Sequence, residues 1–355
     1  MDYLPFGRTG LQVSSVGFGC WEMGGGYGSI EESEAIAAVH RAVDLGINLF
    51  DTAEAYGFGL SEELLTKALG DRRKQIILVT KFGVGYDNDR PRGADGTPER
   101  VRLSIEGSLK ALKTDYVDVY LVHWPDRKTP FDVTMRALED VVQEGKVRFI
   151  GLCNFKLTEL EAAMKARPLD VVQYPYHILD RRMAEWIFPY VEEHGLGLMT
   201  FGTLAYGLLT GGVLEETTFG DGDWRSRGGQ DFALWLFARE LMPRNARMVR
   251  EFADVARRYG MTLPQLAIRW ATAHAAVSVA LVGARRPSEV EDNVRAFDGE
   301  LPSDAFEEID SILAEYEINT APNKWLERED ALDVMPPWHD VSRSWSRNAT
   351  GDGDA

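Results

Sequence analysis

Eight short apolar runs, nearly all followed by a segment whose apolar residues have helical spacing, constrain the fold of this chain most. The runs are continuously apolar, which is typical of parallel strands covered on both faces. Strands that alternate with helices form parallel βαβ units. Eight such units without a linker-like break in composition predict an α/β fold, a closed (β/α)8 TIM barrel. The predicted strands are residues 16–19, 47–50, 76–80, 117–122, 147–152, 171–173, 197–201 and 279–282.

Segments outside these units add further features. Residues 3–13 predict an N-terminal β-hairpin, and residues 205–245 form a long insertion. An extra helix at 303–316 follows the last unit, so we expect one domain over residues 1–340 and a flexible C-terminal tail over 341–355. The predicted helices of the units, the first capped by Ser33, are 33–43, 61–69, 98–112, 131–142, 157–167, 181–194, 246–259, 264–275 and 287–297.

The charge and cysteine content bear on partners and compartment. A formal net charge of −17 disfavours nucleic acid and anionic membranes as partners. Cys20 and Cys153 make no disulfide framework and have no metal-ligand spacing, so we expect buried thiols and no metal site. The sequence shows no signal pattern and no apolar run of about eighteen residues. These features predict a cytoplasmic protein, and they leave its oligomeric state open.

Ionisable side chains stand at the ends of three consecutive predicted strands. Asp51 follows the second strand, Lys81 the third and His123 the fourth, with Tyr56 on the loop after Asp51. The carboxyl ends of barrel strands meet at one mouth, where barrel enzymes carry their catalytic groups. Each of these residues taken alone is more often structural. Their shared position at one mouth predicts a catalytic site.

These four residue types suit proton transfer to a carbonyl oxygen. A phenol has a pKa near ~10, and a neighbouring ammonium is expected to lower that pKa by favouring the phenolate. An aspartate keeps the lysine charged, and a histidine can orient a carbonyl oxygen by a hydrogen bond. No side chain supplies hydride, so reduction of a carbonyl implies a nicotinamide cofactor.

The motifs around these residues resemble those of the aldo-keto reductase family over roughly residues 3–300. By that resemblance Tyr56 is the general acid, Lys81 and Asp51 tune it, and His123 orients the substrate. It implies an NAD(P)-dependent oxidoreductase that transfers hydride between nicotinamide and the carbonyl carbon of an aldehyde, ketone or sugar. The motifs are Asp51-Thr-Ala-Glu-Ala-Tyr56, Lys81, Asp115-Tyr-Val-Asp118, Val122-His123 and Gly145-Lys-Val-Arg-Phe-Ile-Gly-Leu-Cys-Asn-Phe155.

The resemblance also implies where the cofactor lies. Asn154 and Gln173 are expected to hydrogen-bond the nicotinamide carboxamide, Phe201 to stack on the ring, and residues 202–204 to lie along the pyrophosphate. The segment that begins at Gly283 is expected to hold the adenosine end. The full set of expected cofactor contacts is Cys20, Trp21, Asp51, Cys153, Asn154, Gln173, Phe201, Gly202, Thr203, Leu204, Arg225, Gly283, Arg285, Glu289, Asp292 and Asn293.

Some positions depart from the family pattern. Cys153 stands where the family has a serine, which weakens one hydrogen bond to the carboxamide. Glu289 stands where glutamine or arginine is common and would repel a 2′-phosphate. Arg285 and Arg286 would attract that phosphate through charge-assisted hydrogen bonds, so NADP is the expected cofactor, with NAD possible. Three further replacements are Gly202 for serine, Thr203 for proline and Gly212 for lysine.

The expected substrate is a small carbonyl compound or alcohol, whose identity the sequence does not give. Trp21, Phe82 and Trp124, together with Trp224, are expected to form an apolar wall over it. Residues 24–28 are glycine-rich, as a dinucleotide-binding fingerprint is, but they lack the G-x-G-x-x-G spacing. They therefore predict a loop at the barrel mouth rather than a Rossmann fold. The alternative function is a cofactor-binding regulatory protein, similar to channel β-subunits, with weak or no turnover.

Overall fold

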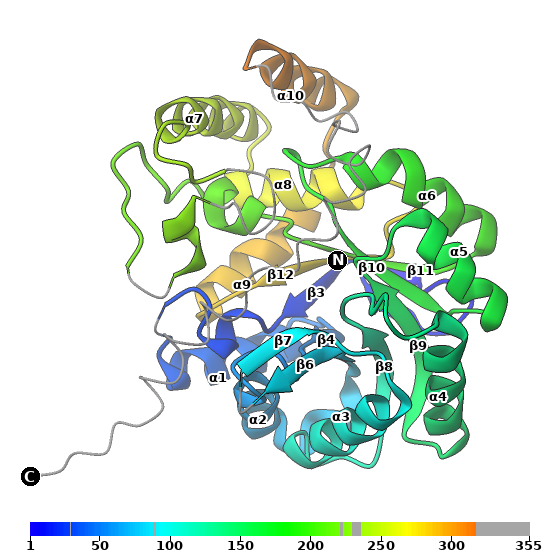
Figure 1. Cartoon of the computed structure of the whole chain (residues 1–355). Helices are drawn as coiled ribbons and strands as arrows, with labels where there is room; N and C mark the ends of the chain where they lie inside the picture. The colour runs from blue at the N-terminus through cyan, green and yellow to red at the C-terminus, as the bar shows by residue number, and fades with distance from the viewer. Residues whose placement is uncertain (29, 88–89, 221–222, 229–235, 317–355) are drawn as a thin grey trace, which may run out of the picture.

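The computed structural model describes residues 1–28, 30–87, 90–220, 223–228 and 236–316. Eight strands form a closed barrel in which neighbouring strands run parallel, and helices surround the barrel (Figure 1). The predicted (β/α)8 fold is thereby confirmed. The barrel strands are β3 (Val16–Gly19), β4 (Leu49–Asp51), β5 (Ile77–Phe82), β8 (Val117–Val122), β9 (Val147–Cys153), β10 (Val171–Pro175), β11 (Gly197–Phe201) and β12 (Val279–Gly283).

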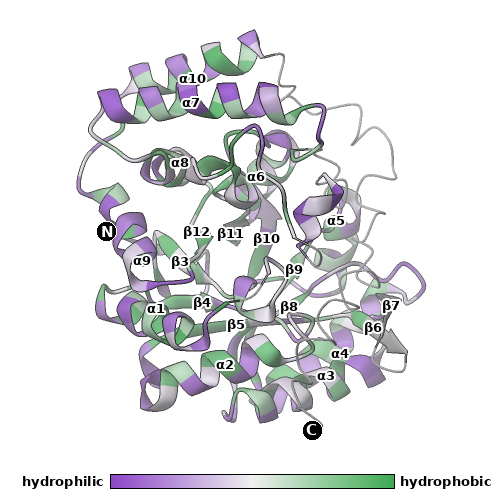
Figure 2. Ribbon diagram, turned by 90° about the vertical axis from the view of Figure 1, so that its left-hand side faces the viewer, coloured by the Kyte–Doolittle hydropathy of each residue, from purple (hydrophilic) through white to green (hydrophobic). Residues whose placement is uncertain are grey.

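Helices cover the outside of the barrel, as their apolar faces require. Helices α7 (Met242–Arg258) and α10 (Ser303–Glu315) pack against each other outside this layer (Figures 1 and 2). The extra C-terminal helix is therefore confirmed. The other helices are α1 (Glu32–Asp44), α2 (Leu60–Leu69), α3 (Pro98–Ala111), α4 (Phe131–Gln143), α5 (Leu157–Ala166), α6 (Arg182–His194), α8 (Leu263–Thr272) and α9 (Pro287–Val294).

The barrel has one closed end and one open end. Side chains that point inward, such as Leu49, Val79 and Val119, form a compact interior cluster that also includes Phe6 and Val13. These two residues belong to the segment of the predicted N-terminal hairpin, β1 (Tyr3–Pro5) and β2 (Gln12–Ser14), which is confirmed. Phe6 lies against Gly197 at the amino end of β11. The hairpin thus closes the amino ends of the strands and leaves the carboxyl ends for a site.

Some local expectations are wrong. The structure begins α1 at Glu32, so Ser33 is not the cap, because the acidic Glu32 and Glu34 suit the first turn of a helix. Helix α7 begins at Met242 rather than at residue 246, because Pro243 fits the first helical turn. Residues 82–97, for which no strand was predicted, contain an antiparallel hairpin, β6 (Val84–Asp87) and β7 (Arg90–Ala94).

Two expectations lie outside what the structure describes, and one finding concerns membranes. The predicted tail over 341–355 and the last part of the predicted domain, residues 317–340, fall outside the described residues. Within the described residues, no helix has both the length and the apolar content that crossing a bilayer requires.

Candidate active site

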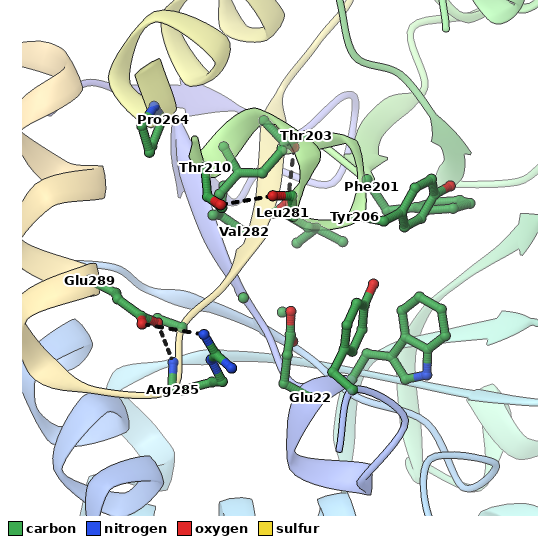
Figure 3. A pocket seen from close by; sticks show the side chains of 18 of the residues that line it. Glu22, Phe201, Thr203, Tyr206, Thr210, Pro264, Leu281, Val282, Arg285 and Glu289 are labelled. Carbon is green, nitrogen blue, oxygen red and sulfur yellow. Dashed lines mark hydrogen bonds and ion pairs between the residues drawn. The ribbon is translucent and has the colours of Figure 1, made fainter. Parts of the chain in front are cut away.

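A cavity of about 600 Å³ opens at the carboxyl ends of the barrel strands (Figure 3). Its wall joins the predicted catalytic end to the predicted adenosine end. Predicted site residues that line it are Trp21, Asp51, Tyr56, His123, Trp124, Cys153, Asn154, Gln173, Phe201, Gly202, Thr203, Leu204, Arg225, Gly283, Arg285, Glu289, Asp292 and Asn293.

Lys81 lies behind this wall and links the catalytic residues. Its Nζ donates to Asp51 Oδ2 at 2.6 Å, to the carbonyl oxygen of Thr52 at 2.9 Å and to Tyr56 Oη at 3.2 Å. These three bonds use all three protons of the ammonium group. The ring of His123 lies 5.7 Å from the ring of Tyr56, edge to face. The four residues predicted as catalytic are therefore assembled at one end of the cavity.

The alternation of side chains along β5 explains why Lys81 reaches the site. Successive residues of a strand point to opposite faces, so Val79 and Lys81 point into the barrel while Phe82 points outward. Lys81 is fully buried, and Asp51 neutralises it at the end of the neighbouring strand. A buried ion pair of this kind is costly to break because either partner alone would be an uncompensated charge.

Burial decides the protonation states in this site. Loss of hydration, and then the negative charge of Asp51, raise the pKa of the Tyr56 phenol well above its ordinary value of 10. This contradicts our expectation from the ammonium alone, because burial of the phenolate outweighs the attraction of Lys81. Burial raises the pKa of Asp51, although Lys81 and Gln173 act against it. Burial and Lys81 hold the pKa of His123 well below 6.5, so its imidazole is neutral at neutral pH.

Amide side chains continue the network from the catalytic end. Gln173 Nε2 donates to Asp51 Oδ1 at 2.9 Å, so Asp51 connects Lys81 to the predicted carboxamide site. Cys153 Sγ lies 3.5 Å from Gln173 Oε1, and Asn154 Nδ2 donates to the carbonyl oxygen of His123 at 3.1 Å. Asn154 has a φ of 64°, a conformation that asparagine tolerates better than most residues. The free thiols Cys20 and Cys153 are both buried, as predicted.

The opposite end of the cavity carries the predicted adenosine residues. The backbone N–H of Arg285 donates to Glu289 Oε2 at 2.8 Å, and Arg286 Nε lies 3.1 Å from Glu289 Oε1. Asp292 accepts hydrogen bonds from Thr262 and Gln265 on the α8 side. On the adjoining loop, Thr203 Oγ1 donates to the carbonyl oxygen of Leu281 at 2.9 Å, which ties that loop to β12.

The structure corrects three placements near the mouth. Phe82 is fully buried and stacks on Tyr120 with ring centroids 4.9 Å apart, so it belongs to the layer between strands and helices rather than to the pocket wall. Cys20 also lies in that layer and does not line the cavity. Trp224 stacks on Trp21 at 6.0 Å without lining the cavity itself. Trp21 and Trp124 do line it.

The cavity wall also contains residues that were not predicted, and three of them carry ionisable side chains. Tyr27, Tyr206 and Glu22 all line the cavity. The side chain of Tyr206 lies against Gly202, and its φ of 57° is rare for an aromatic residue. Tyr27 stands in the glycine-rich loop, and Glu22 follows Trp21. Their closeness in sequence to predicted site residues could have indicated a place in the cavity wall. No periodicity in the sequence indicates that their side chains point toward the cavity.

Comparisons with known proteins agree with this architecture. The family model "Aldo/keto reductase family" matches residues 15–314. The chain is 35% identical over 318 residues to aldo-keto reductase YhdN of Bacillus subtilis (strain 168), covering 88% of this chain and 94% of that protein. It is 32% identical over 321 residues to the NADH-specific methylglyoxal reductase of Escherichia coli (strain K12), covering 86% and 96%.

Solved structures give the same result. The glycerol dehydrogenase AKR11B4 from Gluconobacter oxydans is similar with a TM-score of 0.78 and 32% identity, covering 91% of this chain and 97% of that chain. The holo form of aldo-keto reductase AKR11C1 from Bacillus halodurans is similar with a TM-score of 0.69 and 28% identity, covering 88% and 96%. The chain belongs to the aldo/keto reductase family, a family of oxidoreductases.

Proposed function

We propose that this protein is an NADP-dependent aldo-keto reductase in which Tyr56 exchanges a proton with the substrate oxygen. The observation that carries the proposal is the contact of Lys81 Nζ with both Asp51 and Tyr56 Oη at the end of a long cavity. The volume of about 600 Å³ falls within the usual range of small-molecule sites. A bound nicotinamide supplies the hydride that no side chain can provide.

The residues of the cavity fit the parts of a dinucleotide. Asn154 and Gln173 offer amide groups near the catalytic residues, and Phe201 offers a ring to stack on. Gly202, in the loop expected along the pyrophosphate, and Gly283, at the start of the expected adenosine segment, line the cavity with backbone alone. Arg285 provides positive charge at the far end. This order, from amides through glycines to a cation, supports binding along the wall formed by β9, β10, β11 and β12.

Tyr56 holds the proton that the substrate oxygen receives. Because its pKa is raised, the phenol stays protonated across the neutral range, so the donor form is always present. Negative charge that develops on Oη during transfer is stabilised by Lys81 Nζ, 3.2 Å away. Neutral His123 can donate one hydrogen bond to the substrate oxygen and hold it near Oη. Oxidation of an alcohol would use the same groups in reverse.

The arginines at the far end support NADPH as the preferred cofactor. Arg285 and Arg286 share one carboxylate, Glu289, so this cluster keeps a net positive charge. Both guanidinium groups are at least half exposed and can reorient toward a 2′-phosphate. A ratio of kcat/KM values that favours NADH over NADPH would contradict this part of the proposal.

For the substrate we propose small aldehydes, ketones or polyols. The related proteins include a methylglyoxal reductase and a glycerol dehydrogenase, both named for small polar three-carbon compounds. In this chain, Trp21 and Trp124 border the catalytic end and limit the space above Tyr56. A survey of aldehydes, ketones, sugars and glycerol, followed by nicotinamide absorbance, would identify the class.

The substitution Tyr56→Phe tests the mechanism. It removes the proton donor but keeps the ring, so we expect kcat to fall by about 10² to 10⁴ while the Kd of the dinucleotide changes less than about twofold. Tyr120→Phe is the matched control, because Tyr120 is also a buried tyrosine but faces the helices. Normal turnover in Tyr56→Phe would refute the role of Tyr56. Absence of turnover in the unmodified protein with every substrate would favour a regulatory function.

A further inference from the structure

Glu22 is a carboxyl group inside the cavity that the proposed reaction does not use. It lies in the 3₁₀ turn η1 (Glu22–Gly24), directly after Trp21, and it is half-buried. Figure 3 shows its side chain rising from η1 into the cavity. A carboxyl group at such a position faces whatever ligand fills the cavity.

The end of β12 is shaped to receive this side chain. An added Cβ at Gly283 would overlap the carboxyl group of Glu22, so the two residues can be in contact only because position 283 is a glycine. Gly283 begins the segment that leads to Arg285 and also lines the cavity. The hydrogen bond from Thr203 to Leu281 ties the expected pyrophosphate loop to β12, two residues before Gly283. The carboxyl group therefore lies against backbone where the expected pyrophosphate loop meets the segment expected to hold the adenosine end.

No cation neutralises Glu22 in the part of the chain that the structure describes. Arg225 pairs with Asp223 at 2.5 Å. Arg285 is engaged with Glu289, and dashed lines mark these contacts in Figure 3. Both arginines attract Glu22 from a distance, while Glu289 repels it. Loss of hydration is the larger effect, and it raises the pKa of Glu22 from 4.5 to about 7.

Three further titratable groups around Glu22 stay neutral near pH 7. They are Tyr27 on the following loop, Tyr56 after β4, and Cys20 on the same segment, each of which interacts electrostatically with Glu22. Burial raises the pKa of each of these groups well above its ordinary value. Glu22 is therefore the group in this set that changes charge around neutral pH.

We propose that Glu22 makes dinucleotide binding proton-linked: its carboxyl group must be neutral for the anionic pyrophosphate to lie beside Gly283. This inference rests on the proposed function, since it assumes a dinucleotide in the cavity. Ionised Glu22 repels nearby phosphates, whereas protonated Glu22 can donate a hydrogen bond to a phosphate oxygen. Glu22 is a cofactor-binding residue in this role and takes no part in the proton transfer from Tyr56.

The sign of the effect follows from linkage. A bound anion raises the pKa of Glu22 further, so the complex binds more protons than the free protein. Affinity is then highest when Glu22 is already protonated and falls as pH rises through the pKa of the free protein. We expect the Kd to increase on the order of tenfold between pH 6.5 and 8.5.

The experiment measures Kd for NADH and for NADPH by quenching of tryptophan fluorescence from pH 6 to 9. The variants are Glu22→Gln, which keeps the shape and removes the charge, and Glu62→Gln. Glu62 is the matched control because burial also raises its pKa to about 7, yet it bonds to Thr80 and lies outside the cavity. Glu22→Gln should bind tightly at all pH values, and Glu62→Gln should keep the pH dependence of the unmodified protein.

A second measurement needs no variant. Calorimetric titration of the unmodified protein at pH 7.5, in buffers of different ionisation enthalpy, counts the protons taken up on binding. Net uptake that disappears in Glu22→Gln supports the proposal. A Kd independent of pH, or a dependence that persists in Glu22→Gln, overturns the role of Glu22 and leaves the proposed function intact. Failure of both dinucleotides to bind at any pH overturns the proposed function itself.

Discussion

Burial shifts the pKa values of individual residues in this site more than the nearest charged group does. Lys81 contacts Tyr56 directly, yet the pKa of the phenol is raised because the phenolate would lose its hydration. The ammonium is important at another stage, when charge develops on the phenol oxygen during proton transfer. A raised pKa in the resting site and a stabilised phenolate in the transition state are therefore compatible.

Glu62 lets us test this balance away from the catalytic residues. Glu62 is only 1% exposed as a residue. Its carboxyl group accepts a hydrogen bond from Thr80 Oγ1 at 2.6 Å, and burial raises its pKa to about 7. Folding raises the pKa of Glu62, so the folded protein favours the protonated carboxyl group. The stabilisation from this group is fully present below about pH 4.5 and is lost as pH rises through 7. Glu62→Gln keeps the acceptor oxygen and removes this dependence.

Between pH 5.5 and 8.5, ionisation of Glu62 should lower the free energy of unfolding of the unmodified protein by about 2 kcal/mol. The variant Glu62→Gln should not show this loss. Urea denaturation at the two pH values measures the difference. The exposed ion pair between Arg102 and Asp140 provides a control, because Asp140→Asn should change the pH dependence far less. An equal pH dependence in Glu62→Gln and the unmodified protein would contradict the raised pKa.

At the scale of elements, strand β5 separates catalytic from structural side chains by alternation alone. Phe82, predicted to face the substrate, packs instead on Tyr120 behind the sheet. We expect Phe82→Leu to lower the free energy of unfolding by about 1–2 kcal/mol through lost packing. The KM for the carbonyl substrate should change less than about twofold, as measured by steady-state kinetics.

Trp124→Phe is the informative comparison, because Trp124 lines the cavity and follows the neighbouring strand. That substitution should alter KM more than stability. If Phe82→Leu changed KM severalfold while leaving the unfolding transition in place, Phe82 would belong to the substrate site after all.

The sequence predicted those elements that have a strong apolar period. The strand at 117–122 and the strand at 197–201 have the predicted bounds, and the catalytic residues followed from being next to such strands. The β6–β7 hairpin was not predicted, because its sequence is rich in Gly, Asp and Arg and has no alternating apolar face. Glu22 and Tyr206 were not predicted to line the cavity, because tertiary packing, rather than sequence periodicity, turns their side chains toward it.

The whole molecule combines a rigid barrel with a cavity whose walls come from segments far apart in the chain. Trp21 near the amino end, Tyr206 after β11 and Arg285 after β12 meet around one space. A ligand that spans this space contacts all of these segments at once, and it binds the folded state alone. Ligand binding should therefore stabilise the entire domain rather than one loop.

Thermal unfolding measures this coupling. At a dinucleotide concentration about 100 times its Kd, binding adds about 2.7 kcal/mol to the free energy of unfolding. With an unfolding entropy of about 2.1 cal/mol/K per residue, a domain of about 300 residues should show a rise in Tm of about 4 °C. Tyr56→Phe should show the same rise, because the substitution removes a proton donor and leaves the cofactor contacts in place. If saturating NADPH and NADH both left Tm unchanged in the unmodified protein, the cavity would not be a dinucleotide site, whatever the arrangement of Asp51, Tyr56 and Lys81.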